Sequence, residues 1–270
     1  MRGLTRDSVA EMFDRKTFYL YIVVTILAVA FFVVLGSLNI HIDSGPGPGS
    51  PDRIAEQAQK TVDEMLNGAF SFYVTFLIFL TVLAMAALFP RMLERGRADF
   101  YLSRPLSRTS LYFNKFVGVF ITYGAVIFVS SLVAYVALAI VRGSFDFRFF
   151  AFLMMGAAVS LFIWQSIVIC AGIISGTQTL AIMSAFVIFF GQWVLLHFRD
   201  TIAELIKSKA VTGLLDTLYY ILPKTSEVSN LFGSLGIGKT RLDWMPLYSS
   251  LIFAFVVMYL TVLVFKRKNY

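Results

Sequence analysis

Cysteine and histidine, two residue types that often bind metals or act as nucleophiles and bases, are scarce in this chain of 270 residues. The chain has one cysteine, Cys170, and two histidines, His41 and His197. One cysteine forms neither a disulfide within the chain nor a cysteine-based metal site. We therefore expect Cys170 to be a small apolar packing residue, and we expect no catalytic residue, metal site or cofactor in this chain.

Charge is also missing from long parts of the sequence. Asp, Glu, Lys and Arg do not occur in the windows 17–42, 65–90, 116–141, 149–198 and 244–265. An ion at the centre of a bilayer is costly, and a helix needs roughly 20 apolar residues to cross the hydrocarbon. The window 149–198 is long enough for two helices, and its small polar residues 175–178 favour a tight turn between them. Each of the other four windows fits one helix. The sequence predicts an all-α integral membrane protein with six transmembrane helices.

The expected spans belong to a single transmembrane domain over residues 1–270. They lie at about 17–40, 67–89, 113–141, 149–174, 179–197 and 245–265. The first apolar run is too long for a cleaved signal peptide and lacks a small-residue cleavage site after it, so we expect it to be retained. The segments between the spans are too short to fold alone as soluble domains.

The distribution of basic residues predicts the orientation. With six spans both termini share a side, and that side contains 1–16, 90–115 and 266–270, which carry a clear excess of Lys and Arg. The other side is balanced, and most of its basic residues lie in the long segment 199–243, which weighs little in the positive-inside rule. We expect cytoplasmic termini in a plasma membrane of the bacterial inner-membrane type. The formal net charge of +7 then reflects membrane orientation and does not indicate nucleic-acid binding.

Several segments outside the spans have helical patterns. Residues 5–16 have a capping-box spacing and one apolar face, which favours an N-terminal interfacial helix; a frayed polar tail is the alternative. Ser50 and Pro51 favour the start of an outer amphipathic helix over about 51–66, lying on the outer leaflet or over the translocation path. Two short amphipathic stretches between 202 and Pro223 predict paired short helices that dip into the outer leaflet.

The segment 90–108 is the most informative one outside the spans. Leu93, Arg97 and the pair 100–101 fall on one helical face with charges around it, and Pro105 follows. This pattern predicts an amphipathic helix of two to three turns, parallel to the membrane and ended by the proline.

Within this segment Glu94, Gly96, the run Arg-Pro-Leu-Ser-Arg at 104–108, and Lys115 match a pattern of a known family. The chain resembles the type-2 ATP-binding-cassette (ABC-2) permeases, in particular the NosY-like branch. The resemblance implies the type V exporter fold, in which this loop is a coupling helix inserted into a groove on a separate ATPase subunit. It assigns ATPase coupling, with Glu94 and Arg95 as the main polar contacts, to Arg91, Glu94, Arg95, Gly96, Arg97, Phe100 and Tyr101.

The family resemblance also implies partners. Two ATPase subunits would bind the ATP and Mg, and a second permease copy or paralogue would complete the path through the lipid bilayer. ABC-2 permeases typically carry re-entrant helices between the fifth and sixth spans as a lid on the exit, and that role falls on Leu214, Leu218 and Pro223. The outer segment continues well past Pro223, which also admits an extracytoplasmic partner.

One motif points to a different function. Residues 233–240 have the spacing of a P-loop, in which glycine amides cradle phosphates and a lysine reaches the outer ones. A proline follows at Pro246, no nucleotide-binding fold fits around the motif, and the segment falls on the outer side, where ATP is absent. We expect a flexible loop before the last span.

The residues inside the spans narrow the function further. The few polar ones are expected to bridge helices with modest hydrogen bonds; they are Ser130, Ser131, Ser160, Gln165, Ser166, Ser184 and Gln192. Missing titratable groups disfavour an ion-coupled carrier, and histidines at the membrane edges disfavour an intramembrane hydrolase. With 28 Phe among the apolar residues, a lipid-like or amphiphilic cargo is expected. The alternative is a conformational transmitter that drives an outer partner without carrying cargo.

Overall fold

The computed structural model describes residues 10, 17–37, 51–92, 107–206, 209–239 and 241–267. Its elements are all α-helices, and these described ranges contain no strand. Four helical stretches are long and apolar enough to cross a membrane: Glu64–Met92, Arg108–Arg142, Phe147–Ser175 and Met245–Arg267. Two shorter apolar helical stretches, Phe18–Val34 and Gln178–Gln192, fall at the predicted first and fifth spans. The all-helical architecture is thus confirmed, and the long apolar helices are compatible with a membrane protein.

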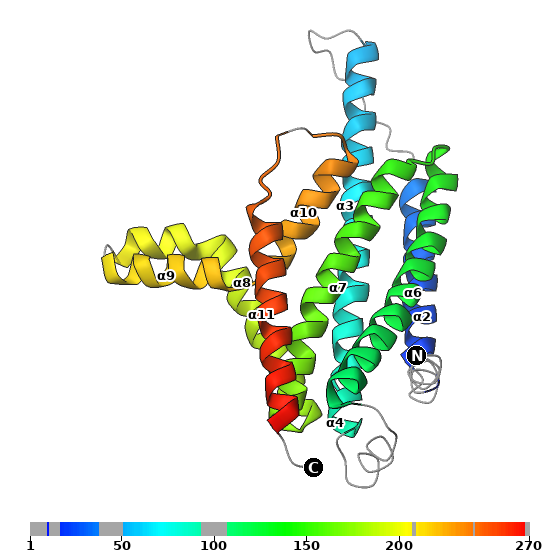
Figure 1. The fold of residues 1–270 in the computed structure, drawn as a ribbon. Helices are drawn as coiled ribbons and strands as arrows, with labels where there is room; N and C mark the ends of the chain where they lie inside the picture. The colour runs from blue at the N-terminus through cyan, green and yellow to red at the C-terminus, as the bar shows by residue number, and fades with distance from the viewer. Residues whose placement is uncertain are drawn as a thin grey trace.

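The helices pack around α7 (Figure 1). In chain order they are α2 (Thr17–Ser37), α3 (Pro51–Met85), α4 (Leu88–Met92), α6 (Arg108–Arg142), α7 (Phe147–Ser175), α8 (Gln178–Ile206), α9 (Lys209–Ile221), α10 (Thr225–Gly236) and α11 (Met245–Arg267). Helix α7 contacts α3, α4, α6, α8, α10 and α11, while α2 packs mainly against α6. The helix α9 and the adjoining part of α8 extend sideways from this bundle (Figure 1).

The tight turn between α7 and α8 forms where the sequence predicted it. Gly176 has a φ of 70°, a left-handed conformation that glycine adopts without steric cost, and its amide donates to Gly172 O at 2.9 Å. At the other end of α7 the Asp146 carboxylate accepts a hydrogen bond from Phe149 N at 3.0 Å and caps the helix. Local sequence signals therefore fix both ends of the central helix.

Hydrogen bonds between buried hydroxyl groups tie α2, α3 and α6 together. Tyr21 Oη lies 2.6 Å from Thr81 Oγ1, and Thr25 Oγ1 lies 3.1 Å from Tyr73 Oη. Tyr73 in turn donates to Ser130 O at 3.4 Å. Side-chain hydrogen bonds of this kind are worth about 1 kcal/mol each between apolar helices. They fix the position of α2 against its neighbours.

The outer helix expected at 51–66 is not a separate element. It is continuous with the next helix, so that α3 runs unbroken from Pro51 to Met85 and projects beyond the other helices (Figure 1). The physical reason is that nothing in the sequence stops it: Gly68 is the one glycine near the junction, and a single glycine costs a helix only about 1 kcal/mol. The helix breaks later, at residues 86–87, before α4.

The outer segment after Pro223 begins with a helix, and the flexible loop expected at 233–240 is wrong for its first part, 233–236. Residues Thr225–Gly236 form α10, which packs against α7 and α11. Its buried side chains Val228, Leu231 and Phe232 recur at helical spacing, and burying them stabilises the helix. The segments 5–9, 11–16, 38–50 and 93–106, which include most of the expected interfacial helix and coupling helix, lie outside the described residues.

Candidate functional site

The start of α10 is fixed inside the bundle by hydrogen bonds. Thr225 N donates to Gln192 Oε1 at 3.2 Å, and Gln192 Nε2 donates to Thr225 Oγ1 at 3.1 Å. The preceding amide, Lys224 N, donates to Ser250 Oγ at 2.8 Å. These bonds join α10 to α8 and α11 and pair backbone amides that have no partner within their own helix. The prediction that Gln192 bridges helices is confirmed.

Two glycines let α10 approach α7 closely. A Cβ atom at Gly156 would lie 2.8 Å from Phe232 Cβ, and one at Gly236 would lie 3.0 Å from Phe149 Cα. Both distances are well inside the optimal carbon–carbon separation of about 3.5–4.0 Å. Small residues at such crossings are typical of helix packing in membranes. The position of α10 therefore depends on the absence of side chains at these two sites.

Helix α10 closes one side of a cavity that lies among α3, α7, α8 and α10. The cavity has a volume of about 140 Å³. Its apolar walls include the aromatic residues Phe79, Trp164, Phe186 and Phe189. Its polar lining residues are Thr75, Ser160, Thr225, Ser226, Ser229 and Asn230. No described residue of the lining carries a charge, and four of the six polar ones come from α10, so the cavity has one polar side and one apolar side.

Ser160 is one of the buried hydroxyl groups in the long apolar helices that have no hydrogen-bond partner among the described residues, and it also lines the cavity. Its side chain is 2% exposed. Most comparable hydroxyls in these helices donate to a carbonyl one turn earlier, as Ser166 does to Phe162 O at 2.9 Å. A buried hydroxyl without a partner costs about 1–3 kcal/mol. The expectation that Ser160 bridges two helices is therefore wrong in this structure.

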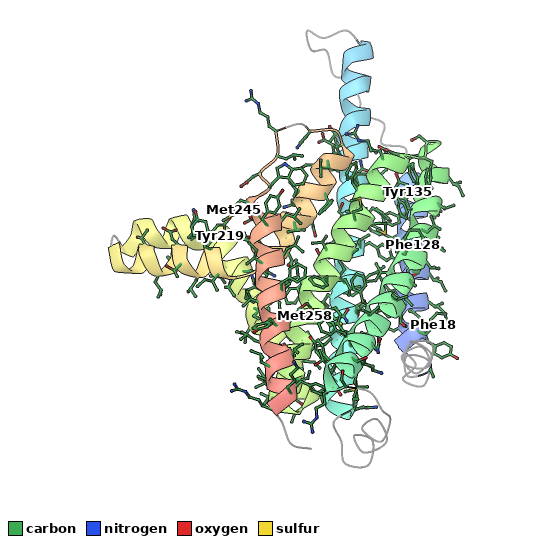
Figure 2. All side chains as sticks on the ribbon, in the orientation of Figure 1. Phe18, Phe128, Tyr135, Tyr219, Met245 and Met258 are labelled. Carbon is green, nitrogen blue, oxygen red and sulfur yellow. The ribbon has the colours of Figure 1, made fainter. Side chains whose placement is uncertain are left out.

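A cluster of aromatic and charged side chains anchors α9 to the bundle. Figure 2 shows Tyr219 where α9 meets the other helices. Lys224 Nζ lies 4.4 Å from the centroid of the Tyr219 ring and donates to Ser249 Oγ at 3.2 Å. The Arg199 guanidinium lies 4.7 Å from the same ring centroid. Cation–π contacts of this type join α8, α9 and α10 at one point.

The pKa values in this cluster are shifted mainly by burial. Lys224 is 5% exposed, and desolvation lowers the pKa of its ammonium, against the opposing effect of Glu227 and Asp243. Burial raises the pKa of Tyr219 to about 12, and its hydrogen bond to Glu227 Oε1 at 2.8 Å acts in the same direction. Burying a lysine ammonium is unfavourable, and the rings of Tyr219 and Tyr220, whose centroids lie 4.4 and 5.5 Å from Lys224 Nζ, partly replace its water together with Ser249.

The structure describes only part of the site that the sequence assigned to ATPase coupling. Arg91 is exposed at the end of α4, near the same end of the bundle as the end of α11 (Figure 1). Arg108 Nη1 donates to Lys266 O at 3.3 Å at this end. Glu94, Arg95, Gly96, Arg97, Phe100 and Tyr101 lie outside the described residues.

The residues assigned to the outer lid divide into two groups. On α9, Leu214 is 61% exposed and Leu218 is 40% exposed, so both present an apolar surface. Pro223 is buried between α9 and α10 and is not part of that surface. Sequence reasoning placed the lid in these residues and missed α10, although the helical spacing of Val228, Leu231 and Phe232 was a signal that could have found it.

The P-loop spacing at 233–240 falls on the end of α10. The amides of Ile237, Gly238 and Lys239 donate to the carbonyl oxygens of Gly233, Leu235 and Ser234 at 3.2, 3.1 and 3.0 Å. These amides close a helix C-terminus and do not form a phosphate cradle. Comparison with known protein families finds no matching family model, and comparison with curated proteins finds no match. The function is therefore argued from the site.

Proposed function

We propose that this chain is the permease subunit of an ABC transporter of the ABC-2 type and exports a lipid-like or amphiphilic cargo. Two separate ATPase subunits would supply the energy, and a second permease copy or paralogue would complete the path across the bacterial inner membrane. The observation that carries the proposal is α10, a helix that follows α9 and precedes α11 in the chain, buries Val228, Leu231 and Phe232, and packs mainly on α7 and also on α11. Re-entrant helices at this place in the chain are typical of the ABC-2 permeases.

The proposed topology has six spans, formed by α2, α3 with α4, α6, α7, the first part of α8, and α11. The exposed basic residues Arg91, Lys266 and Arg267 support a cytoplasmic assignment for the end of the bundle that contains α4. The coupling helix follows Arg91 on this side. There Glu94 and Arg95 would contact the ATPase subunit.

The contacts of α10 suggest how movement at the cytoplasmic side would reach the cargo path. ATP binding would close the two ATPases, push the coupling helices together and tilt the spans. Because α10 is hydrogen-bonded to α8 and α11 and packs directly on α7, a tilt of any of these helices would displace α10. The cavity that α10 closes would then change its shape.

A second candidate function has a specific observation in its favour. Helix α3 projects beyond the rest of the bundle at the end opposite α4 (Figure 1), and α9 exposes Leu214 and Leu218. These features would suit a conformational transmitter that moves an extracytoplasmic partner without carrying cargo. Transport of cargo by the complex without any such partner would exclude this alternative.

The experiment is purification of the full chain with a small affinity tag from membranes of its own host, followed by reconstitution of the complex in vesicles. We expect an ABC ATPase subunit to co-purify at an equal molar ratio to the permease. We also expect the complex to move a fluorescent phospholipid between leaflets only with ATP, and not when the phosphate-binding lysine of that ATPase is replaced by alanine. A permease that is purified intact without any ATPase contradicts the proposal.

A further inference from the structure

The cavity among α3, α7, α8 and α10 is lined by residues of one chain. Its two sides differ chemically. Phe79, Phe186 and Phe189 form the hydrocarbon-like side, and Ser226, Ser229 and Asn230 of α10 form the polar side. Thr75, Ser226 and Asn230 are exposed, which places an opening beside α10. A ligand therefore has access to the cavity between α3 and α10.

The unpartnered hydroxyl of Ser160 supplies an independent reason to expect a ligand. Ser160 Oγ has no hydrogen-bond partner among the described residues, whereas buried polar groups in proteins are nearly always paired. Serine changes the direction of its hydroxyl by rotation about one side-chain bond. Ser160 Oγ is itself buried in the structure, so this side chain would rotate towards the cavity and there meet a ligand oxygen, which supplies the partner that the described residues do not.

We propose that this cavity binds an uncharged, single-chain amphiphile with a hydroxyl or ester group. The ligand oxygen pairs with Ser160, and the hydrocarbon lies against the aromatic residues of α3 and α8. A charged headgroup does not fit, because the described lining has no opposite charge to compensate its desolvation. The volume of about 140 Å³ is close to that of apolar cavities that hold benzene-sized molecules, so the cavity holds the oxygen and the adjacent part of one chain.

This inference deepens the proposed function and rests on it for the role of the ligand as cargo. The binding site itself rests on the cavity and on Ser160. Binding is therefore tested on the full permease chain alone, in nanodiscs and without any ATPase. A permease that binds the amphiphile but has no ATPase partner would overturn the proposed function and leave the binding site intact. A complex that transports cargo without this binding would overturn the binding site and leave the proposed function intact.

Trp164 lines the cavity and reports on binding. The chain has three tryptophans, and replacing Trp193 and Trp244 with Phe leaves Trp164 as the only source of indole fluorescence. The probe is undecanol with a terminal bromine, which quenches indole fluorescence at short range. We expect quenching that saturates with concentration. Bromoundecane, which lacks the hydroxyl, and bromoundecanoate, which is charged, are expected to bind at least threefold more weakly.

Two variants test the position of the ligand. Ser160→Ala removes the hydroxyl, and loss of one neutral hydrogen bond predicts a Kd about three- to tenfold higher for bromoundecanol. Ser131→Ala is the matched control, because Ser131 is equally buried and unpartnered among the described residues but is not part of the cavity lining. Ala185→Leu adds bulk to the cavity wall, and we expect it to abolish saturable quenching.

The inference is overturned if quenching rises linearly with probe concentration, as it does for a probe dissolved in the surrounding lipid. It is also overturned if Ser160→Ala and Ser131→Ala have the same Kd. Equal binding of bromoundecanoate would contradict the uncharged ligand class. Unchanged saturable quenching in Ala185→Leu, with the variant eluting as folded protein, would place the probe outside the cavity.

Discussion

The replacement Gly156→Ala tests whether α10 is held against α7 by the absence of a side chain. The new Cβ would lie 2.8 Å from Phe232 Cβ, so the two helices must separate by about 1 Å to reach an ordinary carbon–carbon contact. Overpacking of this kind costs about 1–3 kcal/mol. The gain in helix propensity from glycine to alanine, about 1 kcal/mol, offsets part of this cost.

A matched control separates the two effects. Gly233 lies on α10 and has nothing within 4 Å of an added Cβ, so Gly233→Ala should gain the propensity without the clash. We therefore expect Gly156→Ala to have a free energy of unfolding about 1–3 kcal/mol lower than Gly233→Ala. The predicted quantity is the difference in free energy of unfolding between the two variants, because the gain in helix propensity from glycine to alanine is common to both and cancels.

The assay is thermal unfolding in nanodiscs, followed by the reaction of Cys170 with a fluorogenic maleimide. Cys170 is the one cysteine of the chain and is partly buried, so its reactivity reports loss of the packed state. We expect Gly156→Ala to react at a temperature several degrees lower than Gly233→Ala. Equal unfolding temperatures, or a higher one for Gly156→Ala, would refute the close packing of α10 on α7.

Three further predictions concern topology, the P-loop spacing and pH. With Cys170 replaced, cysteines at the exposed positions Thr61 and Lys239 should react with an impermeant reagent added outside the cell, and one at the exposed position Thr177 should not; the opposite pattern reverses the orientation. Lys239→Ala should leave the ATPase rate of the complex within about twofold, because the amides around it close a helix; a fall to background with assembly intact contradicts this. Burial lowers the pKa of Lys224, so the unfolded chain binds this proton more strongly and stability should increase as the pH rises from the lowered pKa towards 10.5. Thermal unfolding between pH 7 and pH 10 should show that increase in the native chain and lose it in Lys224→Met, and a variant that keeps it argues against the shift.

Local signals in the sequence were enough to predict the central part of the fold. The turn at Gly176 was predicted because small polar residues interrupt an apolar run, and the structure places a left-handed glycine there. The start of α7 and both limits of α11 follow from the charged residues that flank their apolar windows. Such features depend on residues that are neighbours in the chain, so they can be predicted from a single sequence.

The features that the sequence analysis missed depend on distant contacts. Helix α10 contains Ser, Asn and Gly, which favour a loop, and one face of it packs closely on α7 because Gly156 leaves space there for Phe232. The cavity and the unpaired hydroxyl of Ser160 require the relative positions of four helices. The continuity of α3 was missed although it depends on local sequence. The change from polar to apolar residues near Leu66 was interpreted as the end of one helix, but no proline or other strong helix-breaking residue is present there.

The measurement that tests the central claim most directly is recovery of the ATPase with the Glu94→Lys permease. Charge-assisted contacts across a protein interface are worth a few kcal/mol when they are shielded from water. The matched control is Glu64→Lys, which makes the same change in charge at an exposed position of α3. We predict that Glu94→Lys inserts and unfolds normally but recovers at least tenfold less ATPase, or hydrolyses ATP without moving cargo, while Glu64→Lys matches the native chain. A Glu94→Lys chain that recovers its ATPase fully and moves cargo at the native rate contradicts the account.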